Sequence, residues 1–180
     1  MPPVIHRTYQ SPLLAPGPVY LDSSILVAFT TTHDRYYPRA VQFVGDHQVA
    51  RVELQISVLG LDEALWRLAR GMVARSRNIP IRQLDLGKLV KRGPSVLAPH
   101  LPQLRQAVTF MQTWATLVAP SSSPSQFVDS WLDRLSDIGG LHDAQHLALA
   151  EHTGARSFAT TDRDYQQLTT LPFALMVYRL

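Results

Sequence analysis

The feature that most constrains the fold is an alternation of short apolar runs with longer segments of helical periodicity. Strand-like runs occupy residues 19–21, 51–57, 116–119, 156–160 and 173–178. Apolar residues at helical spacing predict helices over residues 25–29, 34–44, 61–72, 104–115, 127–135 and 142–152. Such alternation predicts an α/β fold with a parallel sheet covered by helices, in which ligands bind beyond the carboxyl ends of the strands.

The domain organisation is expected to be simple. Residues 1–17 are proline-rich and predict a flexible arm, and residues 18–180 predict a single domain. Residues 76–102 are rich in proline and glycine, with one short helix expected near 84–90. We expect no membrane segment, because no stretch is long and apolar enough to cross a bilayer.

The chain has no cysteine, which excludes disulfides and thiolate metal sites. Any metal must therefore be held by carboxylates or imidazoles. A cysteine-free chain also suits the cytoplasm.

Basic residues are concentrated between residues 67 and 92, although the net charge is only +3. Eight of the 17 lysines and arginines fall there, with a single acid, Asp85: Arg67, Arg70, Arg75, Arg77, Arg82, Lys88, Lys91 and Arg92. A solvated helix face is one interpretation of this run, and a track for nucleic-acid phosphates is the other.

Four acids stand at the borders of the expected elements. Asp22 ends the first strand, Glu63 lies in the first turn of a helix, Asp143 opens another helix, and Asp162 follows the strand at 156–160. Each has a structural explanation, such as a favourable interaction with a helix N-terminus or a turn. The predicted topology nevertheless brings all four to one edge, where like charges repel unless a cation neutralises them.

A hard divalent cation suits such an all-oxygen site. Mg²⁺ prefers octahedral oxygen ligands and keeps several waters. A metal-bound water can attack a phosphodiester while the cation stabilises the developing charge. The four acids therefore predict a Mg²⁺ or Mn²⁺ site for phosphate chemistry.

Four segments together resemble the PIN-domain family, and especially the VapC-type toxins of toxin–antitoxin pairs. They are VYLDSS at 19–24, IS at 56–57 through LDEA at 61–64, LHDAQHLA at 141–148 and FATTDRDY at 158–165. The resemblance runs from about residue 19 to residue 178. It implies a three-layer α/β/α fold and a Mg²⁺- or Mn²⁺-dependent endoribonuclease that leaves a 5′ phosphate.

Carried over by position, the resemblance makes Asp22, Glu63, Asp143 and Asp162 the metal-binding and catalytic acids, with Asp164 assisting through water. Thr160 would orient a carboxylate or a water, and Ser23 is a weaker candidate for the same role. The family setting implies an RNA substrate, an antitoxin partner and a homodimer. One departure is a longer stretch between Glu63 and Asp143, which predicts a helical insert around residues 76–115.

Other chemistry finds little support in the sequence. His142 and His146 are four residues apart, but the further residues of a zinc site are missing, so we expect surface or packing histidines. The sequence contains no P-loop, no GxGxxG motif and no GxSxG motif. Two alternatives stay open: a housekeeping PIN nuclease without an antitoxin, and an inactive PIN-like module that binds RNA or serves as a scaffold.

Overall fold

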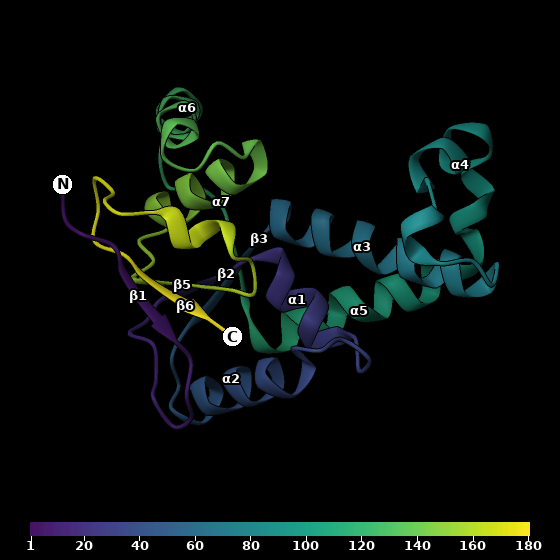
Figure 1. The fold of residues 1–180 in the computed structure, drawn as a ribbon, viewed down its shortest axis with the longest axis horizontal. Helices are drawn as coiled ribbons and strands as arrows, with labels where there is room; N and C mark the ends of the chain where they lie inside the picture. Colours follow the sequence, from purple (N-terminus) through teal and green to yellow (C-terminus); the bar gives the residue numbers. More distant parts are fainter.

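The computed structural model describes residues 1–180 apart from the side chain of Pro94 (Figure 1). The described residues form one six-stranded sheet in the order β1-β6-β5-β2-β3-β4, and every pairing in it is parallel. Its strands are β1 (Ile5–Thr8), β2 (Val19–Leu21), β3 (Leu54–Ser57), β4 (Thr116–Val118), β5 (Ser157–Thr160) and β6 (Met176–Arg179). The predicted α/β class and parallel sheet are confirmed.

Helices cover both faces of the sheet. The α-helices are α1 (Ser23–Thr30), α2 (Tyr37–Val49), α3 (Val58–Ser76), α4 (Leu86–Arg92), α5 (Leu101–Trp114), α6 (Pro124–Ile138) and α7 (Leu141–His152), and short 3-10 helices are η1 (Ile81–Gln83), η2 (Pro94–His100) and η3 (Asp164–Gln167). They match the predicted helices closely. The helix expected from residue 34 begins only at Tyr37, because Asp34 accepts a hydrogen bond from the Tyr36 amide and closes a turn there.

Alternation along β2 separates two hydrophobic cores. Val19 and Leu21 point to one face and pack with apolar residues of α1, α2, α3 and α5. Tyr20 points to the other face and packs with Phe158 and with residues of α6 and α7. The sheet is therefore the middle of three layers, which confirms the predicted α/β/α architecture.

A third, smaller apolar cluster lies away from the sheet. The second half of α3 packs there against α4, η2 and α5, and its buried members are Ala69, Val73, Ala74, Leu84, Leu86 and Leu104. Figure 1 shows α4 and its neighbours at the end of α3 that is remote from the sheet. The short helix expected near 84–90 is present as α4, and residues 76–115 are largely helical.

The prediction of a flexible arm over residues 1–17 is wrong for residues 5–8. These residues form β1, an edge strand that pairs with β6 from Ile5↔Met176 to Thr8↔Arg179. The Val4 amide also donates to the Thr169 carbonyl at 2.9 Å. Long-range backbone pairing thus orders a segment whose own sequence is proline-rich and mostly exposed. No described helix combines the length and the apolar character needed to span a membrane.

Candidate active site

The acids predicted from the sequence meet at the carboxyl edge of the sheet. Asp22 follows β2 and Asp162 follows β5, and these two strands are parallel neighbours, so their ends lie together. A cleft of about 520 Å³ opens at this edge. Nine residues line it, and all four predicted acids are among them: Asp22, Asp62, Glu63, Trp66, Arg67, Leu141, His142, Asp143 and Asp162.

Asp22 lies at the base of the cleft, only 4% exposed. Its Oδ2 accepts hydrogen bonds from the hydroxyls of Ser24 at 2.6 Å and Thr160 at 2.9 Å. The Ser23 hydroxyl lies 3.4 Å from Oδ1. A buried carboxylate needs such partners, and with both of these donors on Oδ2, the nearest groups to Oδ1 are the Ser23 hydroxyl and the ring of His146. Thr160 occupies the orienting position that the sequence predicts, whereas Ser24 was not predicted in this role.

His146 is the functional candidate that the sequence reasoning missed. It is 1% exposed, so it is not a surface histidine, and its ring belongs to the acidic cluster. Its Nε2 lies 3.1 Å from Oε2 of Glu63 and 3.6 Å from Oδ1 of Asp22. Burial alone would lower the pKa of His146, but the hydrogen bond to Glu63 and the nearby carboxylate charges outweigh it and raise that pKa.

A buried hydroxyl chain fixes the orientation of the His146 ring. Nδ1 lies 2.8 Å from the hydroxyl of Tyr20, which lies 2.7 Å from Oγ of Ser57. Ser57 in turn caps α3 by accepting from the Gly60 amide at 3.0 Å. Each hydroxyl can donate or accept, so Nδ1 can either carry a proton toward Tyr20 or accept one from it.

Glu63 lies one turn further along its helix than predicted, because α3 begins at Val58. Burial opposes ionisation of Glu63, but the hydrogen bond and charge of His146 outweigh that effect and lower the pKa of its carboxyl to about 2. Its Oε1 is buried and makes no hydrogen bond, although Nδ1 of the exposed His142 lies 3.0 Å away. This oxygen is therefore available to a cation as well as to His142.

Asp143 occupies the first turn of α7, as predicted. Two features fix the position of its carboxylate: one hydrogen bond and the space left beside Gly140. The hydroxyl of Tyr165 donates to Oδ1 at 3.2 Å. A Cβ at Gly140 would lie 2.2 Å from Oδ2, so the absence of a side chain there lets the carboxylate fold back over the helix start. Burial and the charges of Asp22 and Asp162 raise the pKa of Asp143, although the Tyr165 hydroxyl opposes the rise.

Asp162 and Asp164 form the turn after β5. The Asp162 amide donates to the Thr160 hydroxyl at 2.9 Å, and Oδ1 of Asp162 accepts from the Asp164 amide at 3.0 Å. Asp162 lines the cleft. Asp164 is exposed and belongs to η3, outside the cleft lining.

The innermost part of the cluster fits a divalent cation. Asp22, Glu63 and His146 each offer a ligand atom, and these atoms lie within 4.8 Å of one another. Octahedral coordination at about 2.1 Å places neighbouring ligand atoms about 3 Å apart. The 3.1 and 3.6 Å separations around Nε2 are close to that spacing. Among the described residues, Asp143 and Asp162 lie outside this group of three, at the wall of the same cleft.

The basic residues are not gathered in one place. Arg67 lines the acidic cleft. Arg70 donates from Nε to the Leu84 carbonyl at 3.2 Å and so ties α3 to the segment before α4. The others are exposed along the end of α3 and through η1 and α4: Arg75, Arg77, Arg82, Lys88, Lys91 and Arg92. Lys88 pairs with Asp85 at 3.5 Å.

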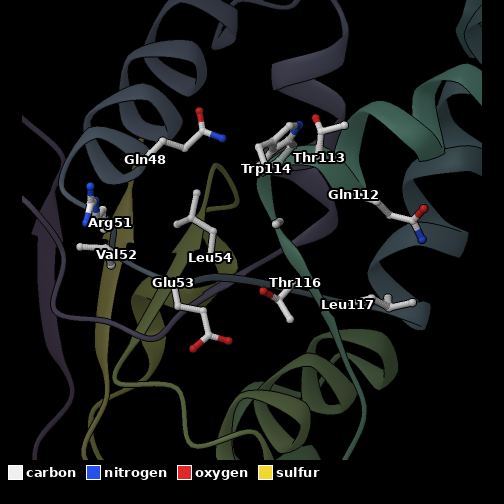
Figure 2. Close-up of a pocket in the computed structure, with 11 residues that line it drawn as sticks. Gln48, Arg51, Val52, Glu53, Leu54, Gln112, Thr113, Trp114, Thr116 and Leu117 are labelled. Atoms are coloured by element: carbon white, nitrogen blue, oxygen red, sulfur yellow. The ribbon is translucent and has the colours of Figure 1, made fainter.

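A second depression, of about 640 Å³, lies at the opposite edge of the sheet (Figure 2). Figure 2 shows it between the end of α2, the end of α5 and the starts of β3 and β4. Glu53 is its only acid and Arg51 its only cation among the described lining residues. Among the described lining residues it therefore lacks the group of acids that lines the other cleft.

Comparisons with known proteins support the fold. Neither a protein-family model nor any curated protein sequence matches the chain. A chain in the crystal structure of VapBC2 from Rickettsia felis, bound to a DNA fragment from its promoter, has a TM-score of 0.51 at 13% identity, over 89% of this chain and 97% of that one. VapC20 of Mycobacterium tuberculosis, a toxin that cleaves the sarcin-ricin loop, has a TM-score of 0.47 at 13% identity, over 82% of this chain and 92% of that one. The Rickettsia felis match spans nearly the whole of both chains, and the two chains therefore share a fold, in agreement with the fold that the sequence resemblance implies.

Proposed function

We propose that this protein is a Mg²⁺- or Mn²⁺-dependent endoribonuclease. The observation that carries the proposal is the convergence of Asp22, Glu63, Asp143 and Asp162 in one cleft, around a buried histidine, in a VapC-like fold. Carboxylates gathered in one cleft repel one another, and a bound cation relieves that repulsion. A divalent cation among oxygen ligands is suited to phosphodiester hydrolysis.

Asp22 and Glu63 hold the cation in this proposal, with Nε2 of His146 as a third ligand. Asp143, Asp162 and Asp164 act through water. For Nε2 to face a cation, Nδ1 must carry the ring proton, and the Tyr20 hydroxyl 2.8 Å away is placed to accept it. Ser24 and Thr160 keep the Asp22 carboxylate fixed whether or not the ion is bound.

The cation supplies two things when bound: it polarises the phosphate, and it lowers the pKa of a water. The acids of the wall orient that water, and Asp143 is kept facing the cleft by Tyr165 and by the missing side chain at Gly140. Arg67 at the cleft mouth and the exposed basic residues toward α4 bind the RNA backbone. Hydrolysis then leaves the phosphate on the 5′ end.

The test is cleavage of a mixed RNA population by the wild-type protein in Mg²⁺ or Mn²⁺, with and without EDTA. Asp22→Asn and Asp143→Asn should each reduce the rate at least about 100-fold, since each removes a charge that positions the reacting groups. Asp133→Asn, an exposed acid of α6 outside the cleft, is the matched control and should retain activity. Undiminished cleavage in EDTA would refute the mechanism.

The biological role we propose is that of a cytoplasmic toxin, held inactive by an antitoxin that covers the acidic cleft. The fold shared with a chain of VapBC2 supports it. A homodimer is expected on the same ground, and light scattering would test it. A small gene adjacent to this one, whose product relieves growth arrest on co-expression, would support the toxin role. Expression without growth arrest would favour the housekeeping nuclease.

The remaining alternative is a PIN-like module that binds RNA without cutting it. The intact set of acids argues against it, because a binding surface gains nothing from carboxylates that repel phosphate. RNA binding without metal-dependent cleavage would establish that alternative.

A further inference from the structure

An exposed tryptophan stands at the mouth of the acidic cleft. Trp66 is 45% exposed and lines the cleft together with the acids. It lies three residues after Glu63 on α3, so both side chains share one face of the helix. Leu141, at the start of α7, lines the same cleft and is 54% exposed. The cleft thus has a charged floor and a partly apolar rim.

The other two tryptophans have structural roles. Trp114 is 8% exposed and packs in the main core against Phe29. Trp131 is partly buried on α6 and donates from Nε1 to the Leu141 carbonyl at 3.0 Å, which ties α6 to the start of α7. Trp66 alone among the three combines a largely exposed indole with a place in the cleft lining.

The chemistry of the rim defines what it can bind. An indole face offers stacking to a nucleobase, and Arg67 beside it offers a positive charge to the adjoining phosphate. Bases inside a duplex are already stacked on both sides, so only an unpaired base can lie on Trp66. Arg67 and the bound cation counter the repulsion between phosphate and the acids.

We propose that Trp66 stacks on an unpaired base next to the scissile phosphate and so fixes where the RNA strand lies for the cut. The inference rests on the proposed function and adds a base-stacking residue to that same site. Trp66 is a specificity-determining residue in this scheme, while the four acids carry out the chemistry.

The experiment uses the full chain carrying Asp143→Asn, in Mg²⁺, so that binding is measured without cleavage. Indole fluorescence is followed while one RNA sequence is added, either unpaired or locked in a hairpin stem. The unpaired form should quench the emission and the stem should not. Trp66→Ala should weaken binding of the unpaired form at least about fivefold. Trp66→Phe should keep most of the affinity but lose the quenching, and Trp131→Phe should keep both.

The possible outcomes separate this inference from the proposed function. If wild type cleaves RNA but Trp66→Ala binds and cleaves it equally well, the stacking proposal is overturned and the nuclease stands. If wild type never cleaves but shows Trp66-dependent quenching by unpaired RNA, base stacking is supported and the nuclease fails. Loss of antitoxin binding alone in Trp66→Ala would show that the rim serves a protein partner, which also overturns the proposal.

Discussion

His146 is a polar residue inside a helix whose other buried side chains are apolar. It contacts two carboxylates through one ring nitrogen and a tyrosine hydroxyl through the other. Before a cation binds, a proton on Nε2 can bridge Glu63 and Asp22. A cation would take that place, with the proton moved to Nδ1. The imidazole ring could therefore keep one position with and without a bound cation, and only the site of its proton would change.

We predict that His146→Gln lowers the affinity for Mn²⁺ by about 10- to 100-fold, because it removes an imidazole that ligates or orients at the site. Titration of Mn²⁺ while following thermal unfolding measures this without any RNA. His142→Gln is the matched control, since His142 also approaches Glu63, at 3.0 Å, but is exposed. Equal Mn²⁺ affinity in His146→Gln and wild type would remove His146 from the metal site.

Gly140 sets the position of the Asp143 carboxylate. Because a Cβ there would lie 2.2 Å from Oδ2 of Asp143, Gly140→Ala must turn that carboxylate away from the start of α7. The obstructing atom is the free end of a side chain, so the fold should accommodate the change. We predict that Gly140→Ala lowers the cleavage rate at least about tenfold and leaves the thermal midpoint of unfolding unchanged. Gly45→Ala is the control, because a Cβ at Gly45 would have open space around it, and this variant should keep the wild-type rate.

At the scale of elements, hydrogen bonds hold residues 9–15 of the N-terminal segment against α2, and we call this set of hydrogen bonds the latch. The Ala15 amide donates to Nε2 of the buried His47 at 2.9 Å, while Nδ1 of His47 lies 2.7 Å from the Phe43 carbonyl. Tyr9 and Ser11 both donate to the Asp46 carboxylate. The latch needs a neutral His47, because a protonated Nε2 cannot accept the amide.

This latch predicts a pH dependence. Burial lowers the pKa of His47 below its ordinary value of 6.5, against the opposing effects of the Phe43 carbonyl and Asp46. The unfolded chain therefore takes up the proton first, and the stabilisation present above pH 6.5 is lost as the pH falls through the lowered pKa. The protection factor for hydrogen exchange at residues 9–15, in which the intrinsic pH dependence of exchange is divided out, should fall over that range, and in His47→Gln it should not change with pH. A pH-independent protection factor in wild type would contradict the latch.

At the scale of the whole molecule, exposed basic residues follow one another along the chain from Arg67 on α3 to Arg92 at the end of α4. We predict that Lys91→Gln with Arg92→Gln weakens RNA binding at low salt. The slope of log affinity against log salt concentration should become shallower by about 0.7 for each phosphate that the variant no longer neutralises. Arg39→Gln on α2 is the control outside this run. If the salt dependence of the double variant equals that of wild type, Lys91 and Arg92 do not bind RNA phosphates, and the prediction is wrong.

Much of this architecture follows from local patterns in the sequence. Asp22 and Asp162 could be placed together because each ends a short apolar run and parallel strands share a carboxyl edge. β1 could not be predicted, since its residues are exposed and their partners on β6 lie more than 160 residues away. The burial of His146 does have a signal in the sequence: it lies within the apolar stretch of α7 formed by Ala144, Leu147, Ala148, Leu149 and Ala150, all of which are buried.

The continuity of α3 has a mechanical consequence. Its first half carries Glu63, and its second half builds the outlying apolar cluster with α4 and α5. The helix has 19 residues without a break and is therefore about 28 Å long, and we expect it to move as one rigid element. Asp22 is anchored separately, at the end of β2. A molecule that binds the outlying cluster and tilts α3 would therefore change the distance between the carboxylates of Glu63 and Asp22.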